Sequence, residues 1–592
     1  MKKNFVKKLF ISVISAATVL SAASCGFFGN RGNNLSDLSN VLSNLSSVLG
    51  SEFSSAASQI TTNTEKEVPV PFAVEIGRNS VYMSVSGNND NDYLSGYCSV
   101  LSPVEFEFND NGPSMWKSSK TYPALNSAID ERNKEVQNLF NTRLSNFKDS
   151  IKNDGMKNSK DSLGNTIFFS INDDAYILRA DSKLFSVCDI TKLVLDPDSP
   201  YLFVETATFD SATGEELFLS DIVEDDENFA EAVVDRLYYY YPDADDFLLG
   251  TRKDLYEELC DRLDGSSSGP LYFTISNIGV TIYFDGDDIA DDPFSIISVC
   301  VPFSGYEELF EDDYISVASD YFSMAVPGGT FYEEDGDIRM MECEEYQNDT
   351  DWRTITNIYV GDDMTMLGED PAYSGDDSGS YGADFYLLHK DGKNYVFADQ
   401  YFDNDYRMVE TFTVSGEKVK KAKGMVDYAE PSFRNVFPGT TEDFVMERRT
   451  DVMRTTTVAN TYTIEKNGLL KEGRSLYHYD ATYNDDVGTK AESEYVSEYT
   501  HSYVTTKADV SVKRINSIND SVEKGIDIVV PAGHRLQLIA TDMKTCAVCS
   551  IMDDNTLVLV PVNPEPGMEG STPQYTGNLP LTEAFEGVFW AG

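Results

Sequence analysis

The chain has 592 residues, of which 41% are hydrophobic and 12% aromatic, and this composition excludes a wholly disordered protein. At about 150 residues per domain, the length predicts roughly three or four domains. The formal net charge of −53 at pH 7 argues against binding to nucleic acid or to anionic lipid headgroups.

Residues 1–24 have the features of a secretory signal peptide. A basic stretch with four lysines precedes an apolar run, 9–20, which is short for a membrane-spanning helix. Small residues then lead into Cys25. This arrangement resembles the lipobox of bacterial lipoproteins, although Ala22 stands where leucine is commonest. The resemblance implies cleavage before Cys25 and a diacylglyceryl group on its sulfur. The alternative is ordinary secretion with cleavage at the Ala22-Ala23-Ser24 site.

The predicted location is the extracellular face of the cell membrane, with a lipid anchor on Cys25. Two acyl chains are enough for stable attachment. Removal of residues 1–24 would lower the formal charge to −57. Residues 25–68 are rich in serine and asparagine and cannot bury enough apolar surface to fold, so they predict a flexible tether.

Residues 69–318 combine helical and strand-like patterns, which predicts an α+β module. A long helix is expected over 130–151, because apolar residues recur there at three- and four-residue spacings. Two further helices are expected over 228–241 and 251–263. Strands are expected within 72–86 (as two strands) and over 166–171, 175–180, 183–190, 201–210, 271–285 (with a turn at 277–279) and 294–303.

Parts of this module resemble two known families. Residues 121–125 (TYPAL), which lead into the long helix, are similar to the deacetylase-accessory family DUF4163. Residues 208–210 (TFD) with 213–215 (TGE), and later 278–284 (IGVTIYF), are similar to the DUF3298 (RsiV-type) family. The resemblance covers about residues 95–310 and implies a role at the cell envelope of a Gram-positive-type bacterium. Related modules occur in the extracellular part of a lysozyme-sensing anti-sigma factor and beside peptidoglycan deacetylase domains.

One stretch departs from the family pattern. Such domains often carry Gly-Gly-Ala-His before the Phe-Asp strand, and residues 197–203 (PDSPYLF) replace it here.

The remainder of the chain predicts β structure. Residues 319–524 contain strand–turn–strand patterns with hairpin signals at Asp335-Gly336 and Asp391-Gly392, which predict an all-β domain, propeller-like or a sandwich. Residues 525–592 resemble a bacterial SH3-like barrel in 530–533 (VPAG) and 585–587 (FEG). The predicted fold class is therefore α+β, an N-terminal DUF3298-like module followed by an all-β domain and a small SH3-like β-barrel.

The sequence predicts no metal site and no cofactor. The four histidines, at 389, 478, 501 and 534, are far apart in sequence. Cys546 and Cys549 form a lone CxxC, whose thiols would point to opposite faces of a strand. Lipidation of Cys25 would leave seven cysteines, an odd number. The apolar surroundings of the others, such as Cys188, Cys260 and Cys300, favour buried, reduced thiols.

No catalytic residue is predicted either. Residues 265–269 match G-x-S-x-G, but a helix is expected before them and a strand after them, the reverse of a nucleophile elbow. The acidic runs 224–227, 285–288 and 376–377 could bind calcium, but they lack EF-hand spacing and favour solvated turns. The tyrosines 238–241 could stack on sugars, although helical geometry favours a division between core and rim.

Together these features favour a non-catalytic surface lipoprotein that binds or senses an envelope ligand: peptidoglycan, another glycan or a cationic, lysozyme-like protein. The alternative is an envelope enzyme that acts on glycans with carboxylates of the β-rich region. Paired carboxylates in a deep cleft would favour the enzyme, whereas a shallow surface lined by aromatic side chains would favour binding.

Overall fold

The structure is a computed structural model, and it describes residues 68–84, 93–153, 169–194, 201–263, 271–290, 292, 294–327, 329–334, 337–347, 354–360, 363–366, 382–401, 407–416, 418–422, 431–481, 502–520, 522–564, 574–588 and 590. In these residues the chain is rich in strands, which form six sheets, and has few helices. No described helix is both long and apolar enough to cross a membrane.

A seven-stranded sheet forms the first part of this region, in the order β19-β1-β2-β4-β5-β6, with β3 paired to β2. Strands β2 and β4 are parallel, because the long helix α3 connects them. The other neighbours are antiparallel. The strands are β1 Ala73–Ser84, β2 Tyr93–Glu107, β3 Met115–Ser118, β4 Phe169–Ala180, β5 Leu184–Val194, β6 Tyr201–Asp210 and β19 Val436–Phe437.

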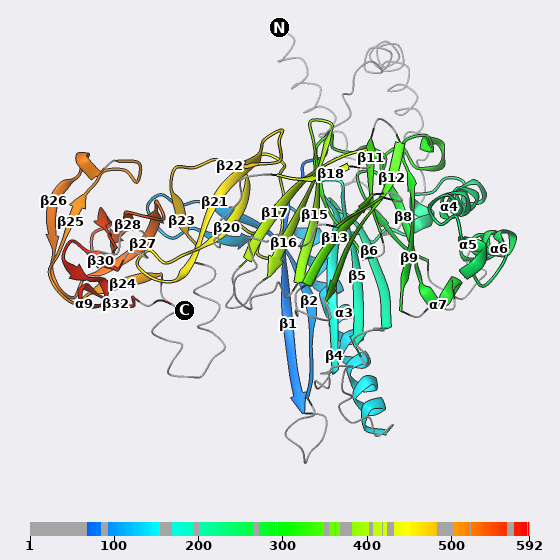
Figure 1. Ribbon diagram of the computed structural model, residues 1–592, viewed down its shortest axis with the longest axis horizontal. Helices are drawn as coiled ribbons and strands as arrows, with labels where there is room; N and C mark the ends of the chain where they lie inside the picture. Colours follow the sequence, from blue (N-terminus) through cyan, green and yellow to red (C-terminus); the bar gives the residue numbers. More distant parts are fainter. Residues whose placement is uncertain are drawn as a thin grey trace, which may run out of the picture. The chain divides into compact units, whose positions relative to one another are not determined.

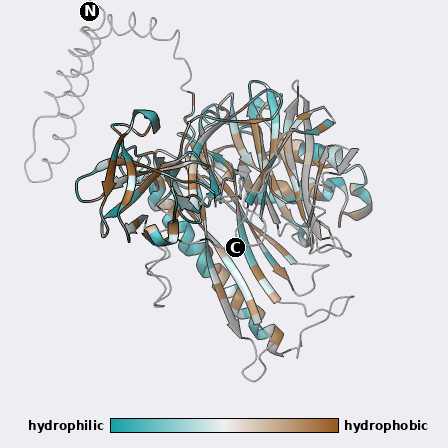
Figure 2. Cartoon of the chain, turned by 60° about the vertical axis from the view of Figure 1, so that its left-hand side comes forward, coloured by the Kyte–Doolittle hydropathy of each residue, from teal (hydrophilic) through white to brown (hydrophobic). Residues whose placement is uncertain are grey.

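Helix α3, Pro123–Asn153, packs along β2 and begins earlier than predicted, because proline is well accommodated in the first helical turn. Its predicted apolar stripe is confirmed. The buried cluster under the helix comprises Leu94, Cys98, Phe140, Leu144, Phe147, Ile151, Phe169 and Ile171. Figure 2 shows both hydrophobic and hydrophilic residues along this helix, as expected for one that covers a sheet.

A second layer joins helices to a three-stranded sheet in the order β7-β8-β9. Figure 1 shows α4, α5 and α6 grouped beside β8 and β9. The elements are η1 Leu219–Asp221, α4 Asp226–Tyr240, α5 Ala244–Phe247, α6 Arg252–Leu263, β7 Tyr272–Ile275, β8 Gly279–Asp285, α7 Gly286–Ile289, β9 Ile296–Pro302 and η2 Glu307–Leu309. The predicted helices 228–241 and 251–263 and the hairpin 271–285 are thus confirmed.

Two antiparallel sheets follow. One has the order β10-β15-β16-β17-β18, and the other has the order β11-β12-β13-β14. The predicted turn at Asp391-Gly392 is confirmed: both residues have positive φ, 52° and 67°, between β15 and β16. The strands are β10 Tyr321–Met324, β11 Thr330–Glu334, β12 Asp337–Gln347, β13 Thr354–Val360, β14 Asp363–Met366, β15 Gly382–Lys390, β16 Lys393–Tyr401, β17 Arg407–Ser415 and β18 Lys418–Lys421.

The last part forms an eleven-stranded sheet and a two-stranded one, β30-β31. The elements are β20 Phe444–Thr450, β21 Thr456–Ile464, β22 Leu470–Glu472, β23 Tyr477–Tyr479, β24 Tyr503–Thr506, β25 Val510–Arg514, η6 Val522–Lys524, β26 Ile526–Val530, β27 Arg535–Thr541, β28 Cys546–Ile551, β29 Thr556–Pro561, β30 Tyr575–Thr576, β31 Leu579–Pro580, α9 Leu581–Ala584 and β32 Phe585–Glu586.

Hydrogen bonds and core packing cross the domain boundaries predicted at 319 and 525. Strand β1 pairs with β19 through Val74↔Phe437. Strand β25 pairs with β26, and β24 pairs with β27. A single buried cluster contains Ile177 of the first sheet, Phe397 of the five-stranded sheet and Val558 of the last sheet. These three regions therefore share one core.

Two strand predictions are wrong in detail. The region 72–86 contains the single strand β1 rather than two strands, because the turn-like Gly77–Ser80 stretch pairs continuously with β2. The predictions 166–171 and 175–180 merge into β4, because Asp173 stays within the strand and accepts a hydrogen bond from the Thr191 hydroxyl of β5 (3.0 Å).

Candidate functional site

A groove of about 340 Å³ lies beside the start of β1 and the end of β2. Four stretches of chain line it, 70–73, 104–106, 116–122 and 438–445, and its largest side chains are aromatic. The lining residues are Val70, Pro71, Phe72, Ala73, Val104, Glu105, Phe106, Trp116, Ser119, Thr121, Tyr122, Pro438, Gly439, Thr440, Asp443, Phe444 and Val445. This volume suits a small-molecule or oligosaccharide segment.

One wall of the groove is an aromatic pair on β2 and β3. Phe106 and Trp116 face each other in the antiparallel register, and their rings meet edge to face with centroids 5.1 Å apart. Phe108, which does not line the groove, packs on Phe106 with ring centroids 4.7 Å apart. All three are only partly buried. The local sequence produces this wall because alternate residues of a strand project to the same face.

The other aromatic pair joins the start of β1 to the segment before α3. The rings of Phe72 and Tyr122 lie 5.2 Å apart, and both are partly buried. Gly439 allows the segment after β19 to approach this pair closely. A Cβ atom at that position would lie 2.2 Å from the backbone nitrogen of Ala73, a distance that real Cβ atoms do not adopt.

The position of Trp116 is fixed from behind by a buried carboxyl group. The indole Nε1 donates to Oε1 of Glu447 on β20 (2.5 Å). Burial raises the pKa of Glu447 to about 8, with a further contribution from Asp480, while Arg434 and the indole oppose the rise. The backbone of Glu447 also exchanges both hydrogen bonds with Ser432 (2.8 and 2.9 Å).

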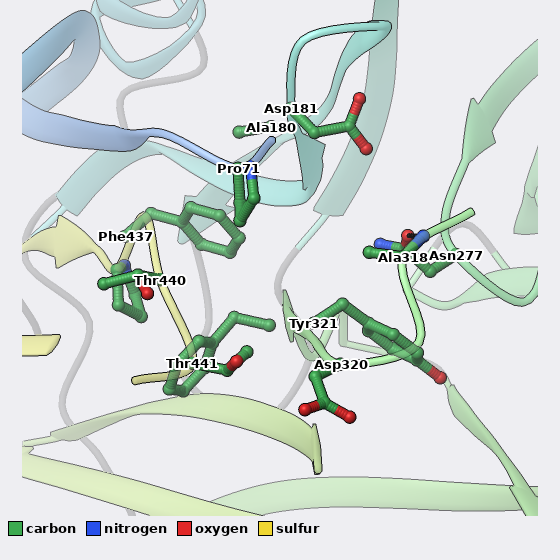
Figure 3. Close-up of a pocket in the computed structure, with 12 residues that line it drawn as sticks. Pro71, Ala180, Asp181, Asn277, Ala318, Asp320, Tyr321, Phe437, Thr440 and Thr441 are labelled. Carbon is green, nitrogen blue, oxygen red and sulfur yellow. Dashed lines mark hydrogen bonds between the residues drawn. The ribbon is translucent and has the colours of Figure 1, made fainter. Parts of the chain in front are cut away.

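The segment after β19 is held from its far side by a buried lysine. The ammonium of Lys390 donates to the carbonyl of Thr441 (3.0 Å) and pairs with Glu442 (2.7 Å). A smaller cavity of about 10 Å³ shares Pro71, Pro438 and Thr440 with the groove (Figure 3). That volume holds about one water molecule, so this cavity is too small for a ligand.

The fold also brings together a serine, a histidine and an aspartate. The Ser114 hydroxyl lies 3.1 Å from Nδ1 of His478, and Asp110 lies 3.8 Å from Nε2. Both Ser114 and His478 are at most 1% exposed. Burial, with a smaller contribution from Arg474, lowers the pKa of His478 to about 4.

These three residues have a structural role. Ser114 cannot act as a nucleophile, because its buried hydroxyl is out of reach of a substrate. The hydroxyl also accepts the backbone N–H of Asn109 (2.9 Å), which fixes the turn before β3. Sequence reasoning missed this contact, since Ser114 and His478 lie 364 positions apart.

Two buried carboxylates lie close together beneath α3. Asp173 and Asp189 are each 2% exposed, and Arg132 forms an ion pair with Asp189. Burial raises the pKa of Asp173 to about 7, and Asp189 adds to the rise. Both groups are enclosed between the helix and the sheet, and they lie outside the β-rich region 319–524 in which the enzyme alternative places its carboxylates.

The structure places the predicted cysteines as follows. Cys546 and Cys549 lie on β28 and belong to different buried clusters, which confirms that they point to opposite faces. Cys188 and Cys300 are buried, as predicted, and Cys260 is partly exposed. Cys98, Cys188, Cys260, Cys300, Cys546 and Cys549 form no disulfide with one another.

The remaining candidates have local roles or lie outside the described residues. Asp225 caps α4 by accepting the Asn228 N–H (3.1 Å), and Asp285 accepts the N–H of Val204 (3.0 Å). Tyr240 is buried and Tyr239 is exposed, which confirms the division between core and rim.

In the described part of the chain, no group of three or more His, Cys, Asp or Glu residues has a geometry suited to a metal. Cys25, His501, 265–269 and 376–377 lie outside the described residues.

The sequence matches no family model and no curated protein. Two solved structures that are similar to the chain belong to the DUF3298 family. One, from Bacteroides fragilis, is 14% identical and has a TM-score of 0.28; the match covers 42% of this chain and 97% of that one. The other, from Pseudomonas aeruginosa, is 12% identical and has a TM-score of 0.27, with coverages of 41% and 96%. The family is the one that the sequence motifs resemble. At these TM-scores, however, membership stays a prediction.

Proposed function

We propose that the protein is a non-catalytic binding protein of the cell envelope and that the groove beside Trp116 binds a glycan. The observation that carries this proposal is the groove itself, in which Phe72, Phe106, Trp116 and Tyr122 surround a volume of about 340 Å³. A shallow surface lined by aromatic side chains is the feature expected of a binding protein, and the aromatic lining of this groove supports the proposal.

The chemistry of the lining suits a sugar. The apolar face of a pyranose ring packs on an aromatic ring, and its hydroxyl groups need nearby donors and acceptors. Ser119, Thr121 and Thr440 supply hydroxyl groups at the same groove. The aromatic rings are also held in place, Trp116 by Glu447 and Tyr122 by Phe72, so little conformational entropy is lost on binding.

Titration calorimetry of the purified protein with N-acetylglucosamine oligosaccharides, fully acetylated and de-N-acetylated, tests this function. Tyr122→Ala is expected to weaken binding about tenfold or more, since it removes one stacking surface. The matched control is Tyr239→Ala, because Tyr239 is 68% exposed on α4 and does not line the groove. If no oligosaccharide binds, or if both variants bind like the wild type, the groove is not a glycan site.

We further propose that a diacylglyceryl group on Cys25 holds the protein at the outer face of the membrane. The motif of small residues before Cys25 supports this assignment, and two acyl chains give stable attachment. Cells fed a labelled fatty acid should incorporate it into the wild type and not into Cys25→Ala. Label in that variant, together with retention in the membrane fraction, would show that Cys25 is not the anchor.

A further inference from the structure

The groove is acidic as well as aromatic. Among its described lining residues no lysine, arginine or histidine occurs, whereas Glu105 and Asp443 both contribute. Both residues are exposed, and within the described residues neither carboxylate belongs to an ion pair. The groove therefore offers negative charge and no positive charge to a ligand.

The closest lysine in the strand register does not cancel this charge. Lys117 stands opposite Glu105 across β2 and β3, but its ammonium is paired with Glu107. Lys117 is also absent from the lining of the groove. Alternation along β2 places the side chain of Glu105 on the face opposite to Phe106, so Asp443 supplies the carboxylate that a ligand in the groove can contact.

The aromatic wall of the groove also favours a cationic ligand. The face of an indole ring attracts cations through its quadrupole. Here the indole N–H donates to Glu447, and this donation to a carboxyl group increases the electron density of the ring. An anionic ligand would instead bring its charge next to Asp443 with no cationic side chain to neutralise it, which opposes binding.

We propose that the groove selects glycans whose sugars carry free ammonium groups, as in amino sugars that lack an N-acyl group, over N-acetylated and anionic glycans. This inference rests on the proposed glycan-binding function. In it, the sugar ring packs against the Trp116–Phe106 wall, and the carboxylate of Asp443 receives the ammonium group.

The test compares the fully de-N-acetylated pentasaccharide of β-1,4-linked glucosamine with its N-acetylated counterpart. Calorimetry is done at pH 6, where the amine is protonated, and in about 0.15 M salt, where the Debye length is about 8 Å and diffuse attraction to the acidic surface is screened. The wild type is expected to bind the cationic pentasaccharide at least about fivefold more tightly, the effect of about one charged contact.

Asp443→Asn is expected to reduce this preference to about twofold or less while leaving affinity for the N-acetylated ligand within about twofold, and Glu105→Gln is expected to leave the preference unchanged. Asparagine is suitable at 443, because the residue has φ of 52°, a conformation that asparagine accepts. The matched control is Asp312→Asn, an exposed acid that does not line the groove, and its preference should equal that of the wild type.

The outcomes separate the two proposals. Equal or tighter binding of the N-acetylated pentasaccharide overturns the inference and leaves glycan binding intact. The absence of binding by both pentasaccharides overturns glycan binding itself. An equal loss of preference in Asp312→Asn and Asp443→Asn shows diffuse attraction to the protein surface, which also overturns the inference.

Discussion

The indole Nε1 of Trp116 donates a hydrogen bond of 2.5 Å to Oε1 of Glu447, although the two residues lie 331 positions apart. This contact joins strand β3 of the first sheet to strand β20 of the last one. Because Trp116 forms part of the groove wall, the same contact sets the shape of the candidate ligand site.

Loss of this contact should destabilise the fold. Trp116→Phe keeps an aromatic ring but removes the indole donor and leaves the buried carboxyl group of Glu447 with one partner fewer. We expect the free energy of unfolding at pH 7 to fall by about 1–3 kcal/mol, the cost of removing one hydrogen-bond partner from a buried polar group. Urea unfolding of the wild type and of Trp116→Phe measures this difference in free energy. Tyr239→Phe, at an exposed site, should change the value by less than about 0.5 kcal/mol.

Glu447 should make stability depend on pH. Its pKa is about 8 in the folded chain and 4.5 in the unfolded chain, so the folded state binds the extra proton between these values. Its contribution to stability is therefore complete below pH 4.5 and is lost as the pH rises through 8, with a slope of up to about 1.4 kcal/mol per pH unit.

Glu447→Gln should remove this part of the pH dependence, since glutamine stays neutral. The difference in unfolding free energy between variant and wild type, measured from pH 5 to pH 9, isolates Glu447 from Asp173 and Asp399, whose pKa values are raised to about 7 and about 6. A pH-independent difference would mean that Glu447 is ionised throughout this range.

The buried hydroxyl of Ser114 should matter for stability and not for ligand binding. Ser114→Ala leaves Nδ1 of His478 and the N–H of Asn109 without this partner, at a cost of about 1–3 kcal/mol. Glycan affinity, measured by calorimetry, should stay within about twofold of the wild type. A large loss of affinity with unchanged stability would instead assign Ser114 to the ligand site.

Helix α3 should depend on its buried stripe. Phe140 is 1% exposed, so Phe140→Ala is expected to cost about 3–5 kcal/mol. Asn138→Ala on the exposed side of the same helix is the control and should cost less than about 1 kcal/mol. A similar small loss in Phe140→Ala would show that the stripe is not packed against the sheet.

Local patterns predicted most of the elements but not their partners. The strand 201–210 and the turn at Asp391-Gly392 follow from residues adjacent in sequence, and the structure has both. The continuity of β1 through Gly77–Ser80 could not be predicted, because pairing with β2 overrides the turn preference of these residues.

The groove could not be predicted for the same reason. Phe106 and Trp116 are close in sequence, but Glu447 and Gly439 are more than 300 positions further along the chain and reach the groove only through the tertiary fold. The aromatic residues alone gave no signal, since aromatic side chains in strands usually belong to the core.

The pairing of Val74 with Phe437 has a consequence for biosynthesis. At about 5–20 residues per second, a ribosome needs roughly 20–70 s to pass from the first of these residues to the second. During that interval Val74 and Glu75, at the start of the outer edge of β1, have no strand to pair with, and open edges of this kind can pair with other chains. Exposure of this part of the β1 edge before Phe437 arrives is therefore expected to affect the yield of folded protein rather than its final stability.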